Sequence, residues 1–187
     1  MNATDKDREL IARIAKRDSA ALRALFTLHQ VKLYRFLVRI VRNEAIAEEL
    51  VNETFIKVWT KAGTYKYQST VSTWIFTIAR NEAMSLLRKK SDASLDDDAA
   101  SQIEDESDTQ EVTIAKKDKG ALMRACIDKL SDAHREIVDL VYYQEKSITE
   151  VSTILEIPVN TVKTRMFHAR QQLSTHFKRA GVDRGWP

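Results

Sequence analysis

The spacing of apolar residues predicts helices along the first half of the chain. Between residues 47 and 61 they recur at helical intervals, in the stripe Leu50, Val51, Phe55, Val58 and Trp59. This helix is expected to end near Gly63, and another to run from about residue 73 to 90. Residues 6–45 supply two further amphipathic helices, separated by a cap at Asp18-Ser19. Together these elements predict a helical bundle.

The second half of the chain shows the same period. Ser131 is expected to cap a helix whose apolar positions are Leu130, Ile137, Val138, Val141 and Tyr142. Ser147 and Glu150 have the spacing of a capping box at the start of the next helix. Pro158 interrupts that helix but suits the first turn of another. Two short helices joined by such a turn are the helix-turn-helix pattern, whose second helix enters the DNA major groove.

The second helix of this motif has two contrasting faces. At 100° per residue, its buried side consists of Val162, Met166, Ala169 and Leu173. The opposite side presents Thr164, Phe167, His168 and Gln171, flanked by Asn160, Thr161, Lys163, Arg165 and Arg170. Hydrogen-bonding groups, cations and one apolar ring suit base edges and thymine methyl groups. Packing of Phe167 on a neighbouring helix is the alternative.

The turn of the motif departs from its usual composition. Glu156 stands where glycine is common. We therefore expect a left-handed glutamate, at about 1 kcal/mol, or a different turn.

Composition favours an all-α protein. Only 4 Gly and 2 Pro accompany a chain of 187 residues that is 43% apolar, so tight hairpins are few and a core can form. The single cysteine, Cys126, excludes an intrachain disulfide and a multi-cysteine zinc site, and we expect it to be buried. We predict no cofactor and no metal. No apolar run approaches the roughly 20 residues that span a bilayer, so we expect no membrane insertion and a cytoplasmic protein.

Charge divides the chain into three parts. Residues 1–90 have 17 Lys and Arg against 9 Asp and Glu, and residues 113–187 have 13 against 9. Between them, residues 91–112 contain nine acidic residues and no base, which predicts a flexible acidic linker. Two basic helical domains suit a polyanionic partner, although chance segregation of surface charge would give the same totals.

The segment "TYKYQSTVSTW", residues 64–74, interleaves aromatic residues with a cation and small polar groups. Aromatic rings stack on unpaired bases at about 1–3 kcal/mol each, and cations bind phosphates. The segment therefore favours single-stranded DNA. Trp74 is also spaced with Ile78 on an apolar stripe, so core packing is equally open for it.

Two motifs resemble the sigma factors of bacterial RNA polymerase, in their extracytoplasmic-function (ECF) branch. "SITEVSTILEIPVNTVKTRMFHARQQL" is similar to region 4.2, and residues 47–90 are similar to region 2. The resemblance implies region 2 in residues 1–90, an acidic connector like region 3.2 in residues 91–115, and region 4 in residues 116–187. In the family, the connector approaches the active-site channel. At His168 relatives often have an arginine, so the preferred promoter is expected to differ.

The resemblance also implies roles for individual residues. Contacts with the upstream promoter element are expected from Asn160, Thr161, Lys163, Thr164, Arg165, Phe167, His168, Arg170 and Gln171. Contacts with the melted minus-ten element are expected from Tyr65, Lys66, Gln68, Ser69, Trp74, Arg80, Asn81 and Arg88. Contacts with polymerase are expected from Glu48, Glu49, Asn52, Glu53 and Lys57.

The partners implied are promoter DNA, the β′ clamp helices and β flap of core polymerase, and an anti-sigma factor. The free chain is expected to be a monomer. A stand-alone helix-turn-helix regulator is the alternative, but it would normally dimerise and would not need the aromatic segment. We expect no enzymatic activity, because the sequence has neither a His-Glu-x-x-His motif nor a Gly-rich phosphate loop.

Overall fold

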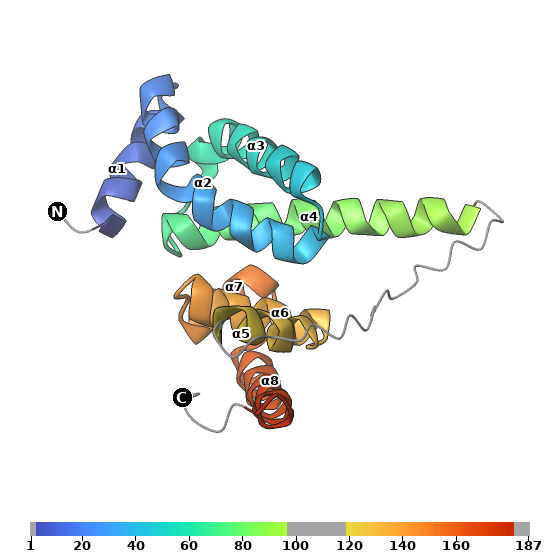
Figure 1. The fold of residues 1–187 in the computed structure, drawn as a ribbon. Helices are drawn as coiled ribbons and strands as arrows, with labels where there is room; N and C mark the ends of the chain where they lie inside the picture. The colour runs from blue at the N-terminus through green and yellow to red at the C-terminus, as the bar shows by residue number, and fades with distance from the viewer. Residues whose placement is uncertain (1–2, 97–118, 182–187) are drawn as a thin grey trace.

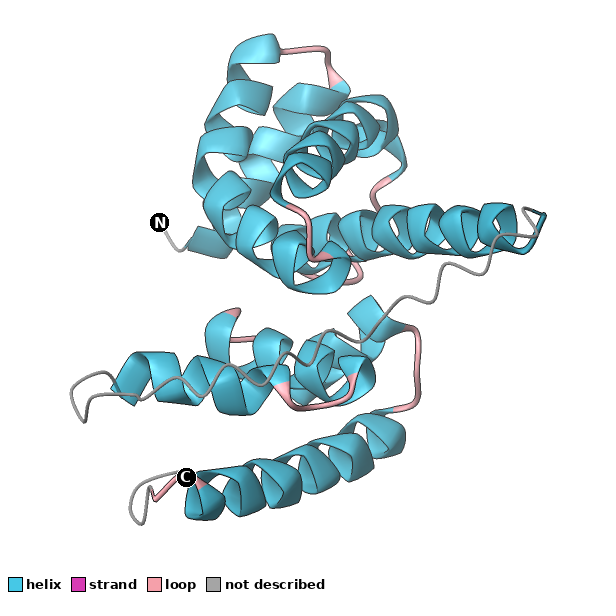
Figure 2. Ribbon diagram, turned by 45° about the vertical axis from the view of Figure 1, so that its right-hand side comes forward, coloured by secondary structure: helices cyan, strands magenta, loops and turns pink. Residues whose placement is uncertain are grey.

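The computed structural model describes residues 3–96 and 119–181, and these residues form only helices and connecting loops (Figures 1 and 2). The N-terminal group of helices comprises α1 (Ala3–Ala15), α2 (Ser19–Val41), α3 (Glu44–Lys61), the short η1 (Ala62–Thr64) and α4 (Val71–Asp96). The C-terminal group comprises α5 (Lys119–Asp128), α6 (Asp132–Val138), η2 (Asp139–Tyr143), α7 (Ile148–Leu155) and α8 (Val159–Arg179). The predicted all-α class is confirmed.

Polar side chains fix the starts of the N-terminal helices. Asp18 Oδ1 accepts hydrogen bonds from the backbone amides of Ala20 and Ala21, at 2.9 and 3.2 Å, which starts α2 where the sequence predicted a cap. Asn43 Oδ1 accepts from the amide of Ile46 at 3.0 Å and starts α3 three residues earlier than expected. The first residues of these helices are therefore set by local hydrogen bonds more closely than by the spacing of apolar residues.

Helices α1 to α4 enclose an apolar core. Phe36 of α2 and Phe76 of α4 are fully buried, with ring centroids 5.1 Å apart. Phe26 and Phe55 join α2 to α3 through an edge-to-face contact at 4.9 Å. This core holds α3 and α4 side by side.

The two groups of helices pack against each other, which the sequence did not predict. Helices α6 and α7 lie beside α4, and α8 lies on the far side of them (Figures 1 and 2). Ile137, Leu140, Val151 and Ile154 are buried in the same apolar cluster as the core of the N-terminal group. Arg39 of α2 forms an ion pair with Asp139 of η2, whose side chain is 3% exposed. The groups therefore share one core in this conformation.

The predicted acidic linker begins inside a helix. Helix α4 continues to Asp96, past the predicted domain boundary at residue 90. The rest of the predicted linker lies outside the described residues. Among the helices of the described part, none is both long and apolar enough to cross a membrane.

Candidate nucleic-acid interface

Helices α7 and α8 form the predicted helix-turn-helix. At the start of α7, the Glu150 amide donates to Ser147 Oγ at 3.3 Å and the Ser147 amide donates to Glu150 Oε2 at 3.0 Å, which confirms the capping box. Glu156 ends α7 in the left-handed region, with φ of 55°. The left-handed alternative was therefore correct. The Ser152 hydroxyl supports the turn by donating to the carbonyl of Ile157 at 2.6 Å.

Helix α8 packs one face on the protein and leaves the other open. The predicted buried residues Val162, Met166, Ala169 and Leu173 are all buried. Phe167 is 63% exposed, and its ring meets the edge of the His168 ring with centroids 5.5 Å apart. This burial pattern excludes packing of Phe167 on a neighbouring helix in this conformation. The other predicted residues with exposed side chains are Asn160, Lys163, Thr164, His168, Arg170 and Gln171.

Residues at the edges of this face contact other parts of the protein or are half-buried. Arg170 Nε donates to the hydroxyl of Tyr142 at 2.9 Å, and its guanidinium lies 5.8 Å from the centroid of that ring. Thr161 and Arg165 are half-buried. The freely accessible groups therefore lie along the centre of the predicted face.

The aromatic segment between η1 and α4 is more buried than the sequence suggested. Tyr65 is only 8% exposed, and its ring lies between those of Tyr67 and Trp74, at 4.7 and 5.0 Å between centroids. Its hydroxyl donates to the carbonyl of Ser69, and burial raises its pKa. Tyr65 therefore offers little surface to a base in this conformation. Trp74 is half-buried, packed against the core from the edge.

Tyr67 is the aromatic residue that the predicted site omitted. Its ring is 47% exposed, and its backbone has φ of 58°, a left-handed conformation that costs a non-glycine residue about 1 kcal/mol. Such strain is concentrated at functional positions. Lys66 and Gln68 on either side are also exposed, whereas Ser69 is half-buried. The accessible part of the segment is thus Lys66 to Gln68.

Two polar residues of α4, Arg80 and Asn81, face the C-terminal group. Arg80 donates two hydrogen bonds to Glu136, at 2.7 and 3.5 Å, and the Asn81 amide donates to Glu156 at 3.0 Å. Arg88, about two helical turns further along α4, is exposed. A hollow of about 710 Å³ lies beside them, lined by Arg80, Asn81, Met84, Leu87, Arg88, Ser91 and Glu156. Arg80 and Asn81, two of the predicted minus-ten residues, are therefore in contact with carboxylates of the C-terminal group.

The outer face of α3 is acidic and accessible. Glu48, Glu49, Asn52 and Glu53 are exposed, as the sequence predicted. Lys57 is instead ion-paired with Glu82 of α4. Ile56, on the same helix, is also exposed, and the predicted site omitted it. Its exposure could have been predicted, because the helical spacing places it outside the buried stripe. The outer face of α3 therefore has exposed carboxylates around one exposed apolar side chain, that of Ile56.

The described residues contain no group of three or more metal-binding side chains. Cys126 is buried, and burial raises its pKa, so the thiolate that reacts with electrophiles is disfavoured.

The two halves of the chain match two protein families. Residues 25–92 match Sigma-70 region 2, and residues 121–173 match Sigma-70, region 4. The ECF RNA polymerase sigma factor SigW of Bacillus subtilis is 30% identical over 172 residues, covering 87% of this chain and 92% of that protein. SigK of Mycolicibacterium vanbaalenii is 26% identical, covering 84% and 82%.

Solved structures are similar over both halves. The sigma factor RpoE in complex with the anti-sigma factor NepR from Bartonella quintana has 26% identity and a TM-score of 0.66, covering 87% of this chain and 98% of that one. CnrH in complex with the cytosolic domain of CnrY has a TM-score of 0.68 at 22% identity, covering 93% and 98%. The second likeness concerns the fold.

Proposed function

The chain belongs to the ECF branch of the sigma-70 family, and we propose that it directs RNA polymerase core enzyme to specific promoters and initiates transcription there. A sigma factor of this family is an initiation factor without enzymatic activity. The observation that carries the proposal is the pairing of an open recognition face on α8 with an aromatic and basic surface beside α4 in one chain. We assign region 2 to residues 1–90, the connector to 91–115 and region 4 to 116–187.

Region 4 reads the upstream, minus-thirty-five element through α8. Lys163 and Arg170 are suited to phosphates, and Thr164, Phe167 and His168 to base edges in the major groove. Asn160, Thr161, Arg165 and Gln171 complete the proposed contacts. The imidazole of His168 cannot form the bidentate contact that arginine makes with guanine, so the preferred base at its position differs from that of arginine-bearing relatives.

Region 2 captures the non-paired strand of the minus-ten element. Tyr67 supplies the open ring for stacking, and Lys66 and Arg88 supply cations for the backbone. Tyr65, Gln68, Ser69, Trp74, Arg80 and Asn81 form or border the same pocket. Binding energy, and not hydrolysis, drives strand opening, because stacking of bases on an exposed ring is gained only with unpaired DNA.

The acidic face of α3 docks on core polymerase. Glu48, Glu49, Asn52, Glu53 and Lys57 meet the β′ clamp helices, and region 4 meets the β flap. Since the similar sigma factor RpoE was co-crystallised with the anti-sigma factor NepR, we propose that an anti-sigma factor holds this chain inactive too. The site of action is the cytoplasm, where RNA polymerase works.

Reconstitution with core polymerase tests this function. A sigma factor co-migrates with core enzyme in gel filtration and confers initiation at defined sites, mapped by sequencing the 5′ ends of transcripts made in vitro from a genomic template. Core enzyme alone is the control. A stand-alone regulator would bind duplex DNA without co-migrating, and that result would overturn the proposal.

A further inference from the structure

Arg170, at the edge of the recognition face of α8, is held by a side chain from outside the helix-turn-helix. Its Nε donates to the hydroxyl of Tyr142 at 2.9 Å, and its guanidinium lies 5.8 Å from the centroid of the tyrosine ring. Tyr142 belongs to η2 and lies 28 residues earlier in the chain. The contact therefore joins the helix that faces DNA to the element that follows α6.

The ring of Tyr142 is itself fixed by packing. It is half-buried and packs against two apolar clusters, the shared core and the smaller cluster that includes Leu173 and Phe177 of α8. Element η2 is one turn of π-helix, in which the amide of Gln144 donates to the carbonyl of Asp139 at 3.0 Å. Such turns occur frequently at functional sites. The packing therefore holds the tyrosine hydroxyl at a fixed place beside α8.

The group that holds Arg170 is uncharged, which matters for binding a phosphate. A carboxylate partner offsets the positive charge of an arginine, as in the ion pairs of Arg42 with Asp132 at 3.1 Å and of Arg80 with Glu136 at 2.7 Å. A tyrosine hydroxyl accepts a hydrogen bond and leaves the charge in place. Because the bond uses Nε, the terminal nitrogens of the guanidinium are left to donate to phosphate oxygens.

A long side chain that is ordered before binding loses less freedom when DNA binds, so its contact contributes more to affinity. We propose that Tyr142 is a positioning residue, which holds the guanidinium of Arg170 in place for a phosphate beside the minus-thirty-five element. The proposal rests on the function given above, because it requires that α8 binds promoter DNA. Tyr142 itself contacts Arg170 and not the DNA.

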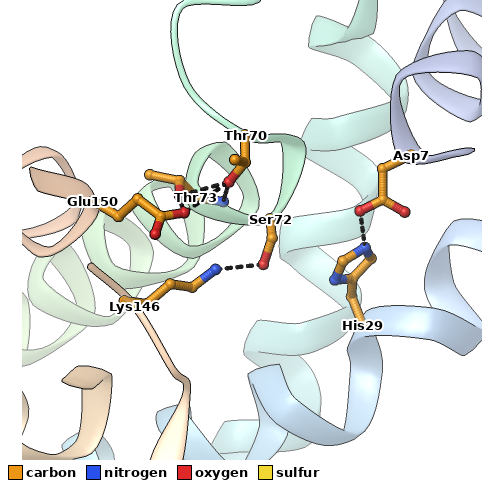
Figure 3. A network of polar contacts seen from close by, with 7 residues as sticks. All are labelled: Asp7, His29, Thr70, Ser72, Thr73, Lys146 and Glu150. Atoms are coloured by element: carbon orange, nitrogen blue, oxygen red, sulfur yellow. Dashed lines mark hydrogen bonds and ion pairs between the residues drawn. The ribbon is translucent and has the colours of Figure 1, made fainter. Parts of the chain in front are cut away.

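The recognition face of α8 is accessible in the full-length chain without polymerase. Phe167, at the centre of this face, is 63% exposed. Region 2 contacts region 4 from the other side, where Lys146 donates to the hydroxyl of Ser72 at 2.6 Å and Glu150 accepts from Thr73 at 2.7 Å (Figure 3). Helix α8 lies beyond α6 and α7 as seen from α4 (Figure 1). Binding of duplex DNA to α8 can therefore be measured on the free chain.

The test is a double-mutant cycle on duplex binding. Tyr142→Phe removes the hydroxyl and keeps the ring, Arg170→Ala removes the guanidinium, and the double variant completes the cycle. Tyr143→Phe is the matched control, because it removes the same atom from the next residue, whose ring lies 4.2 Å from the guanidinium of Arg39. The probe is a fluorescein-labelled duplex of about 20 base pairs and random sequence, since phosphate contacts do not depend on sequence. Anisotropy at several salt concentrations gives Kd, and circular dichroism checks each fold.

We expect Tyr142→Phe to weaken binding about fivefold, the middle of the range that ordering one long side chain costs on binding. Arg170→Ala should weaken binding at least as much and reduce the slope of log Kd against log salt by about one, as for one lost phosphate contact. In the Arg170→Ala background, Tyr142→Phe should have no further effect, whereas a purely structural role would weaken binding equally in both backgrounds. The control should bind like the wild-type chain.

Three results would each overturn the proposal: equal affinities of Tyr142→Phe and the control, an equal loss in both backgrounds, or a salt slope that Arg170→Ala leaves unchanged. The last comparison stays decisive even if a tyrosine variant does not fold, because Arg170 is exposed.

Transcription with core polymerase separates this proposal from the function on which it rests. If the wild-type chain initiates at defined promoters but the cycle shows no coupling between Tyr142 and Arg170, positioning fails and the function stands. If the cycle shows coupling but the chain does not initiate with core polymerase, the function fails, and the role of Tyr142 in duplex binding stands.

Discussion

Replacement of Phe167 by alanine separates DNA recognition from stability. A phenylalanine side chain has roughly 200 Å² of surface, and 63% exposure leaves about 125 Å² for a partner. At ~25 cal/mol per Å², complete burial against DNA would contribute at most about 3 kcal/mol. Protein–DNA interfaces are wet, so we take half of this, or about tenfold in Kd. The free energy of unfolding should change by less than about 0.5 kcal/mol, because the ring is not part of the core.

The assay is fluorescence anisotropy of the holoenzyme on a promoter duplex, accompanied by thermal unfolding of the free chain. Ser174→Ala, at an exposed position nearer the end of α8, is the matched control. Two results would refute the reasoning: equal affinity of the Phe167→Ala holoenzyme and the control, or a large loss of thermal stability, which would mean that the ring packs on the protein.

Three further changes follow from the same structure. Ile137→Ala removes a fully buried side chain of the shared core and should cost about 2–5 kcal/mol in urea unfolding, whereas Leu28→Ala, 47% exposed, should cost under about 1 kcal/mol. Burial alone would raise the pKa of Glu150, but hydrogen bonds from Thr73 and Ser147 and the charge of Lys146 lower it from 4.5 to about 2. Its stabilisation is therefore complete above pH 4.5 and lost as the pH falls through about 2; Glu150→Gln should flatten this part of the pH profile of unfolding. His168→Arg should change base preference at one upstream position in a randomised-promoter selection, and an unchanged preference would exclude this side chain from base readout.

Features encoded within a few residues of sequence could be predicted. The cap at Asp18, the capping box at Ser147 and the two faces of α8 depend on spacings of three or four residues, and the structure has them as expected. The exposure of Phe167 followed from the same helical period. Each of these features is decided by local backbone geometry, which the sequence specifies directly.

Features that depend on distant residues could not be predicted. Arg80 and Glu136 are 56 positions apart, and no periodicity relates them, so the sequence indicated a free arginine where the structure has a paired one. The sequence predicted that the Tyr65 ring would be available to stack on a base, but the rings of Tyr67 and Trp74 pack against it. The packing of α4 against α6 and α7 could not be predicted either. Each apolar stripe could be assigned to a core within its own half of the chain, so none indicated a contact between the halves.

The ion pair between Arg39 and Asp139 affects how the N-terminal and C-terminal groups of helices align on each other. Burial lowers the pKa of Arg39, and the Asp139 side chain is almost fully withdrawn from water. A shift of the two groups of helices by one helical turn would leave the Asp139 carboxylate buried without its partner, at a cost of about 3–5 kcal/mol. Apolar side chains therefore hold the two surfaces together without fixing their alignment, and the Arg39–Asp139 pair, together with the Arg80–Glu136 pair, favours one alignment over the others.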